Sequence, residues 1–116
     1  MELSYNAQTK LLEKALESGK LSGLKRKWPQ QAELLMRAMI IAKSSNNMND
    51  LSQFAWLRPH PLRKDDRHKF ERLSLSPQGR LRIELASQDQ ARKKLKELDY
   101  ASPYAHVLEV SEHYGD

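Results

Sequence analysis

Two pairs of residues have side chains suited to cleaving a phosphodiester. His60 and Arg63 lie close together in a proline-flanked segment, and His113 and Tyr114 are neighbours at the end of the sequence. RNA carries its own nucleophile, the 2′-hydroxyl, so a protein must remove that proton, stabilise charge on the phosphate and protonate the leaving oxygen. These residue types suit the three tasks without a metal ion. The alternatives are a histidine packed at a strand edge for His60 and an ordinary aromatic residue for Tyr114.

The formal charge of the chain is concentrated around the first pair. The 116 residues include 20 Lys and Arg against 15 Asp and Glu, a net charge of +5. From Arg58 to Arg82 there are eight basic and three acidic residues, so this window holds the whole excess. A localised basic patch is typical of a protein with a polyanion partner, because neutralised phosphates release counterions. The alternative is a solvated strand face that keeps the protein soluble.

Several other classes of chemistry lack the residues that they need. The chain has no cysteine, which excludes disulfides and thiolate metal sites. Its four histidines form no close His-x-His or HExxH pair, and no carboxylate cluster accompanies them, so we expect no metal ion and no other cofactor. The scattered glycines match no phosphate-binding loop, and no nucleophile elbow is present.

Length and hydropathy indicate one domain, over residues 1–116, that does not cross a membrane. A chain of this size buries one core but not two. The longest purely apolar run is Ala38 to Ala42, far short of the roughly 20 residues that span a bilayer. Met1 to Tyr5 show no basic region followed by an apolar stretch, so we expect no signal peptide and a cytoplasmic location.

The spacing of apolar residues predicts the elements that hold these side chains. Two helices are expected, one after Asn6 to about Ser18 and one with Pro29 in its first turn to about Ser44, joined by a basic connector. Residues 87–98 are typical of a short surface helix or a mobile insertion. Strands are predicted at residues 2–5, 56–62, 68–75, 80–86 and 104–112. This order favours an α+β fold, with a mostly antiparallel sheet of four or five strands and both helices on one side.

Strand alternation also predicts which side chains share a face. Along residues 80–86, the inward set is Leu81, Ile83 and Leu85 and the outward set is Arg80, Arg82 and Glu84. In the last strand, His106, Leu108 and Val110 are expected on one face. Prolines in the segment 56–62 cannot donate ladder hydrogen bonds, so we expect an accessible edge or irregular strand there.

Four segments of the chain, in their order and spacing, resemble the RelE/ParE toxin superfamily, in particular its HigB-like plasmid-maintenance killer branch. Residues 58–65, RPHPLRKD, are similar to that family's R-x-H-x-L-K-G-D segment, and residues 107–116, VLEVSEHYGD, to its I-L-E-V-x-D-Y-H-G-K ending. Residues 1–14 resemble its first strand and helix, and Phe70 with residues 80–83 its third and fourth strands. The likeness covers nearly the whole chain.

The resemblance implies a RelE-like, microbial-RNase-like fold and a toxin that cuts mRNA on the ribosome without a metal ion. It also implies a small helix-turn-helix, HigA-like antitoxin encoded beside it. The toxin would contact operator DNA only through this antitoxin. Carried over by position, His60 matches the active-site histidine and Arg80 the phosphate-binding arginine. Arg63 stands where the family has a catalytic lysine, and an arginine can clamp phosphate but cannot exchange a proton at neutral pH. His113 and Tyr114 occupy the terminal Tyr-His pair in swapped order.

Further basic residues of the window would hold RNA under this hypothesis. They are Arg58, Lys64, Arg67, Lys69, Arg72 and Arg82. Two other functions stay open. A related toxin that acts on DNA gyrase would keep the fold, but such toxins lack the catalytic histidine, so His60 argues against that function. A non-catalytic nucleic-acid-binding module would use the basic window alone.

Overall fold

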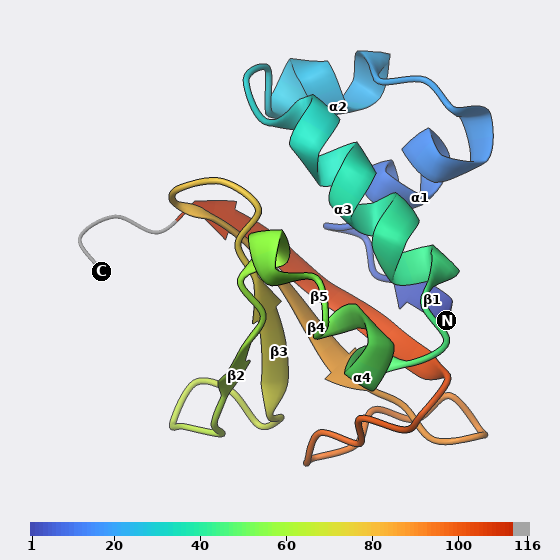
Figure 1. Ribbon diagram of the computed structural model, residues 1–116, viewed down its shortest axis with the longest axis vertical. Coiled ribbons are helices and arrows are strands. Elements are labelled where there is room, and N and C mark those ends of the chain that lie inside the picture. The colour runs from blue at the N-terminus through green and yellow to red at the C-terminus, as the bar shows by residue number, and fades with distance from the viewer. Residues whose placement is uncertain (113–116) are drawn as a thin grey trace.

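The computed structural model describes residues 1–112, which form a five-stranded sheet backed by helices (Figure 1). Neighbouring strands from β2 to β5 pair antiparallel, whereas β1 runs parallel to β5. The α+β class and the five strands are confirmed, but the sheet is mixed. The strands lie in the order β1-β5-β4-β3-β2, with bounds β1 Glu2–Tyr5, β2 His60–Leu62, β3 Arg72–Leu75, β4 Leu81–Ser87 and β5 Tyr104–Glu112.

The helices lie on one face of this sheet, but their number and placement differ from the two helices predicted (Figure 1). The basic connector is in fact α2, which buries Leu24 completely and keeps its lysines and arginine exposed. One buried leucine in six residues leaves too little periodicity to predict a helix. Within residues 1–112 no helix is long and apolar enough to cross a membrane. The bounds are α1 Lys10–Ser18, α2 Ser22–Lys27, α3 Ala32–Ser44, α4 Met48–Leu51 and a 3₁₀ turn, η1, at Ala55–Leu57.

The start and the end of α1 are set by side-chain and backbone hydrogen bonds. The Asn6 side chain accepts from the backbone N–H groups of Gln8, at 2.9 Å, and Thr9, at 3.1 Å, so it closes a turn and the helix begins later than predicted. At the other end Gly19 has a φ of 70°, and its N–H donates to the carbonyl of Ala15. Only glycine adopts this left-handed conformation without strain, so the predicted stop is confirmed.

A single apolar core lies between the helices and the sheet. The inward set predicted for β4 is confirmed, since its three members are buried in the core. Met39 of α3 is completely buried with them, as expected for a packing residue. The largest fully buried side chains are Leu12, Leu24, Leu35, Met39, Met48, Leu51, Leu57, Leu73, Leu75, Leu81, Ile83 and Leu85.

A bulge in β5 changes which of its side chains face the core. Leu85 pairs with Val107, but Glu84 pairs with Glu109, so Leu108 is an extra residue in the ladder. Val107 and Val110 contact the core, whereas Leu108 and Glu109 line the opposite face of the sheet. The predicted common face for His106, Leu108 and Val110 is therefore wrong at Val110, because strict alternation does not pass through a bulge.

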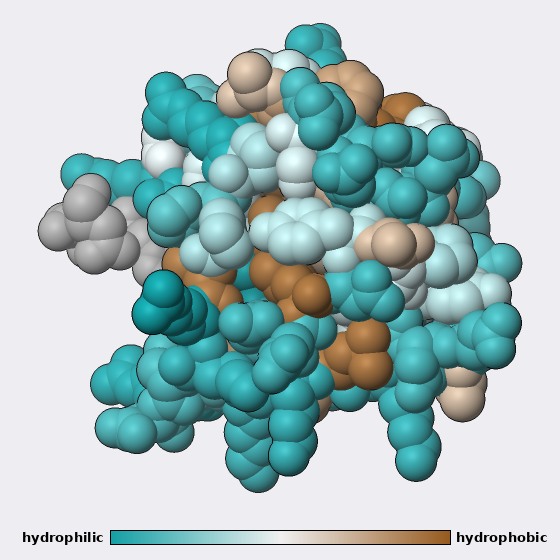
Figure 2. Space-filling view, turned by 60° about the horizontal axis from the view of Figure 1, so that its bottom comes forward, coloured by the Kyte–Doolittle hydropathy of each residue, from teal (hydrophilic) through white to brown (hydrophobic). Residues whose placement is uncertain are grey.

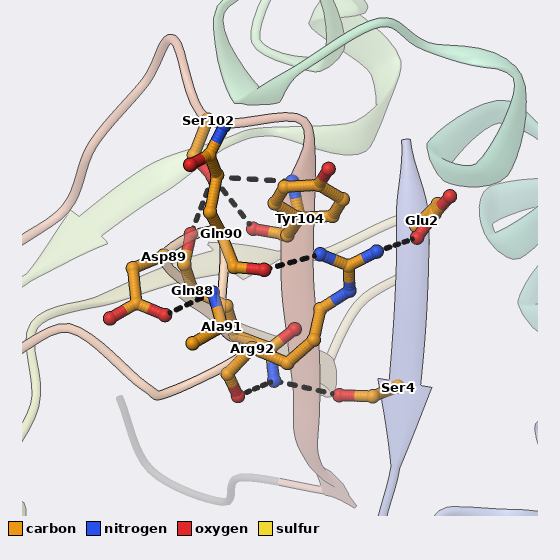
Figure 3. A network of polar contacts seen from close by, with 9 residues as sticks. All are labelled: Glu2, Ser4, Gln88, Asp89, Gln90, Ala91, Arg92, Ser102 and Tyr104. Atoms are coloured by element: carbon orange, nitrogen blue, oxygen red, sulfur yellow. Dashed lines mark hydrogen bonds and ion pairs between the residues drawn. The ribbon is translucent and has the colours of Figure 1, made fainter.

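The loop between β4 and β5 is bound to β1 and β5 and is not the short surface helix predicted as one possibility (Figure 3). The Arg92 guanidinium pairs with the Glu2 carboxylate at 2.5 Å and lies over the Tyr104 ring, 3.4 Å from its centroid. Gln88 Nε2 donates to the Ser4 hydroxyl at 2.9 Å and to the Arg92 carbonyl at 3.0 Å. These contacts hold the loop in a fixed shape without helical hydrogen bonds.

Candidate functional site

A row of polar side chains crosses the face of the sheet that the helices leave uncovered. His60 pairs with Ser74, Ser74 with Glu84, and Glu84 with Glu109, so the row takes one residue from each of β2, β3, β4 and β5. Their sequence neighbours in β3 and β4 are buried leucine and isoleucine, which point to the core. The alternation that builds the core thus also aligns these four side chains.

The first of two hollows on this face surrounds His60 and has a volume of about 440 Å³. We name it the His60 hollow; its lining residues are Arg58, His60, Leu62, Ser74, Ser76, Arg82 and Glu84. Arg82 is held in place because Nη1 donates to the Ser76 hydroxyl at 2.5 Å and to the Gly79 carbonyl at 3.2 Å. One histidine, two arginines and a carboxylate therefore meet in one concave space.

Arg58 reaches this hollow from a backbone conformation that is unfavourable for arginine. Its φ of 48° and ψ of 56° are left-handed, and its N–H donates to the Ala55 carbonyl at 3.0 Å to close η1. A residue with a Cβ in this region costs roughly 1–2 kcal/mol. The strain turns the chain from η1 into β2 and coincides with a side chain of the candidate site, a combination that is common at functional sites.

We predict that Arg58→Gly is more stable than Arg58→Ala by about 1 kcal/mol. Both variants remove the guanidinium, but only glycine accepts the positive φ without steric cost. Urea unfolding of the two purified variants measures the difference. Equal free energies of unfolding would mean that the backbone at this position is not left-handed.

One lining residue of the hollow, Glu84, belongs to a buried ion pair. Arg72 Nε donates to Glu84 Oε1 at 2.6 Å, and the two residues are only 5% and 3% exposed. Arg72 Nη1 also donates to the carbonyls of Phe70, at 3.1 Å, and Arg63, at 3.4 Å. Burial alone would raise the pKa of Glu84, but hydrogen bonds from Glu109 and Arg72 and the charge of Arg72 lower it below its usual value. Arg72, predicted as an exposed RNA contact, is thus engaged inside the protein.

A second hollow, of about 320 Å³, adjoins the first and shares Glu84 with it. We name it the His68 hollow; it is lined by Arg67, His68, Lys69, Phe70, Arg72, Glu84, Leu108 and Glu109. The hydrogen bond that the Glu109 carboxyl donates to Glu84, together with burial, raises the pKa of Glu109. From the sequence we expect no carboxylates beside a histidine, and that expectation is wrong at His68. His68, Glu84 and Glu109 offer three ligand atoms within 4.8 Å of one another. These three could hold a metal ion.

Of the remaining predicted site residues, some lie on loops and two lie at the end of the chain, outside residues 1–112. Arg63, Lys64, Arg67 and Lys69 are exposed on the β2–β3 loop, and Arg80 is exposed just before β4. Among the residues described, neither Arg63 nor Arg80 lines the His60 hollow. His113 and Tyr114 lie outside the described residues. The structure therefore brings His60 together with Arg58 and Arg82.

Sequence reasoning missed five polar residues of the two hollows as site residues: His68, Ser74, Ser76, Glu84 and Glu109. For Glu84 the signal was present, since alternation already placed it on the face of Arg82. For Glu109 no such signal was present, because only the bulge at Leu108 turns the Glu109 side chain to the face of Glu84. The end of the molecule that carries the β2–β3 loop is largely hydrophilic, with only small apolar patches (Figure 2).

Comparison with known proteins yields no match: no protein-family model, no curated protein and no solved structure is similar to this chain. The fold and the site define an α+β protein whose uncovered sheet face carries a hollow lined by histidine, arginine and carboxylate side chains. Its function is therefore argued from that hollow and from the sequence segments described above.

Proposed function

We propose that the protein is the toxin of a type II toxin-antitoxin system, a HigB-like endoribonuclease that cuts mRNA on the ribosome and so inhibits translation. The His60 hollow carries this proposal, because a side chain that can exchange protons lines it together with two arginines that can hold a phosphate. The resemblance of the four segments supports it. A five-stranded sheet with helices on one face is compatible with the RelE-like fold that the resemblance implies.

In this mechanism His60 takes the proton from the 2′-hydroxyl, whose oxygen attacks the phosphorus. The O2′–P bond forms, the P–O5′ bond breaks, and the products are a 2′,3′-cyclic phosphate and a 5′-hydroxyl. Arg58 and Arg82 stabilise the negative charge that grows on the phosphate oxygens. The proton for the leaving oxygen comes from His113 or Tyr114, the pair that the resemblance assigns to the active site. No metal ion is needed in this reaction.

The basic loop beside the hollow would hold the flanking RNA. Lys64, Arg67 and Lys69 are exposed there, and each phosphate that they neutralise strengthens binding and its dependence on salt. Arg63 and Arg80 add positive charge nearby in the sequence. The same charge suits capture by a HigA-like antitoxin, since complementary charge makes association rapid and selective. The ribosome with its mRNA is the target, and the cytoplasm is the compartment that this function requires.

Induced expression with and without the neighbouring gene tests the proposal. We expect growth arrest and new 5′ ends within translated mRNAs, both relieved when the neighbouring gene is expressed as well. Growth arrest with intact transcripts would contradict it. In that case a supercoiling assay with purified DNA gyrase tests the gyrase alternative. RNA binding without cleavage by the purified protein, on ribosomes and off them, would leave the non-catalytic binding module.

A further inference from the structure

The His68 hollow brings together three side chains that are distant in the sequence but suited to one metal ion. His68 comes from the β2–β3 loop, Glu84 from β4 and Glu109 from β5. Their ligand atoms, one imidazole nitrogen and two carboxylate oxygens, all lie within 4.8 Å of one another. Glu84 is buried and the other two are half-buried, so the cluster differs from the exposed acidic groups that surfaces commonly carry.

The imidazole of this cluster is oriented by a carboxylate outside it. His68 Nδ1 lies 2.9 Å from Asp65 Oδ1, which also accepts from the backbone N–H groups of Arg67 and His68. The bonds with His68 and Arg67 hold the pKa of Asp65 below its usual value. In the neutral imidazole the contact with Asp65 favours the tautomer with the proton on Nδ1, which leaves the lone pair on Nε2. Histidines that bind metal ions are commonly oriented in this way.

The hollow provides room for a cation. Its two carboxylates lie among three basic side chains, so an ion would bind through its ligand bonds and not through an overall negative charge. Ligand atoms of a tetrahedral Zn²⁺ site lie about 2.0–2.2 Å from the ion and hence about 3.4 Å from one another. The three ligand atoms, which are now within 4.8 Å, must therefore approach one another by up to about 1.4 Å. His68 lies on a loop and Glu109 is half-buried, so both can approach the buried Glu84. Arg72 pairs with one oxygen of Glu84. An ion bound by Glu84 and Glu109 replaces the hydrogen bond between these two carboxyl groups, and the proton of that bond is released. Water from the hollow completes the coordination.

We propose that His68, Glu84 and Glu109 form a binding site for a divalent transition-metal ion such as Zn²⁺. One imidazole with two carboxylates favours Zn²⁺ over Mg²⁺ and Ca²⁺, which prefer oxygen ligands only. The ion would join the β2–β3 loop to β4 and β5, next to the proposed cleavage site but separate from its chemistry. This inference does not depend on the proposed nuclease function.

Zinc titration of untagged, EDTA-treated and dialysed protein tests the site. We expect calorimetry to give one Zn²⁺ per chain with micromolar affinity, a rise in Tm that EDTA reverses, and no such rise with millimolar Mg²⁺. His68→Ala and Glu109→Gln should each weaken binding at least tenfold. Asp65→Asn should weaken it by about tenfold or more through the orientation of His68. These side chains are outside the core, so the variants should keep the fold, unlike changes at Glu84.

His60→Ala and His106→Ala are the matched controls, since each removes one histidine of residues 1–112 that lies outside the cluster. Both should bind Zn²⁺ as the unchanged protein does. The inference is overturned if the unchanged protein binds no Zn²⁺ at about 100 μM, roughly 100 times the expected dissociation constant. The same holds if His68→Ala binds Zn²⁺ as tightly as the controls. It is also overturned if either control loses as much affinity as His68→Ala. Metal binding is measured directly, so a negative result would leave the nuclease proposal untouched.

Discussion

Arg72→Met is expected to destabilise the protein by about 3–5 kcal/mol, because it leaves the carboxylate of Glu84 buried without its partner. The carbonyls of Phe70 and Arg63 lose a donor at the same time. Domains of this kind are stable by only about 5–15 kcal/mol, so the variant should lose roughly 10 °C or more in Tm. Thermal unfolding followed by circular dichroism measures the loss. Lowering the pH toward 5 should reduce it, because protonation removes the unpaired charge.

Two further variants distinguish the two possible causes of this destabilisation, the unpaired buried charge of Glu84 and the loss of an arginine side chain as such. Arg82→Met removes the same kind of side chain from the same face. Within residues 1–112 Arg82 bonds only neutral groups, in Ser76 and Gly79, so we expect a cost of about 1 kcal/mol. The double change Arg72→Met with Glu84→Met removes both charges and should recover most of the stability. If the double variant is no more stable than Arg72→Met, the isolated carboxylate is not the cause.

His60→Ala is expected to lower the rate of mRNA cleavage by about 10²–10⁴-fold, the usual contribution of a general base. The side chain is exposed, so stability should change by no more than about 0.5 kcal/mol. Single-turnover cleavage of mRNA in programmed ribosomes measures the rate, and thermal unfolding confirms that the variant is folded. Loss of cleavage in a folded variant is therefore a loss of chemistry.

Two further variants make this result specific. Arg82→Lys keeps the positive charge but loses the forked geometry for phosphate, so we expect an intermediate rate. Arg37→Ala removes an exposed arginine of α3, on the other side of the molecule from the uncovered sheet face, and should cleave normally. If His60→Ala cleaves at the rate of Arg37→Ala, the base lies elsewhere and the His60 hollow is not the cleavage site.

Helices and strands could be predicted where the apolar residues follow the spacing of one kind of element, every second residue for a strand or every three to four for a helix. β1 and β5 have the predicted bounds, and α3 ends at Ser44 as expected, because strand-forming residues and the apolar stripe run to the ends of these elements. The bulge within β5 changes the faces of its residues but not its ends. α2 was missed because its single buried leucine gives no stripe. The β4–β5 loop was mistaken for a possible helix, since its composition suits one and the contacts of Arg92 that hold it are made with distant residues.

The candidate site could be predicted only where it follows from position along a strand. His60 and Arg82 were identified from residue type, charge and alternation, and they do meet in one hollow. The burial of Arg72 was missed because an arginine on an outward strand position is normally solvated, whereas here Glu84 lies beside it. The convergence of His68 with Glu109 depends on the bulge and on a loop, and neither has a local sequence signal.

The parallel pairing of β1 with β5 affects how the protein must form during synthesis. Glu2 pairs with Tyr104, about a hundred residues further along the chain, and such distant contacts form late because of their loop-closure entropy. The antiparallel pairs of β2, β3 and β4 join strands that are close in the sequence. A nascent chain can therefore assemble the middle of the sheet first. Glu109 and the first strand are added only once β5 has left the ribosome, so the His68 hollow is completed last.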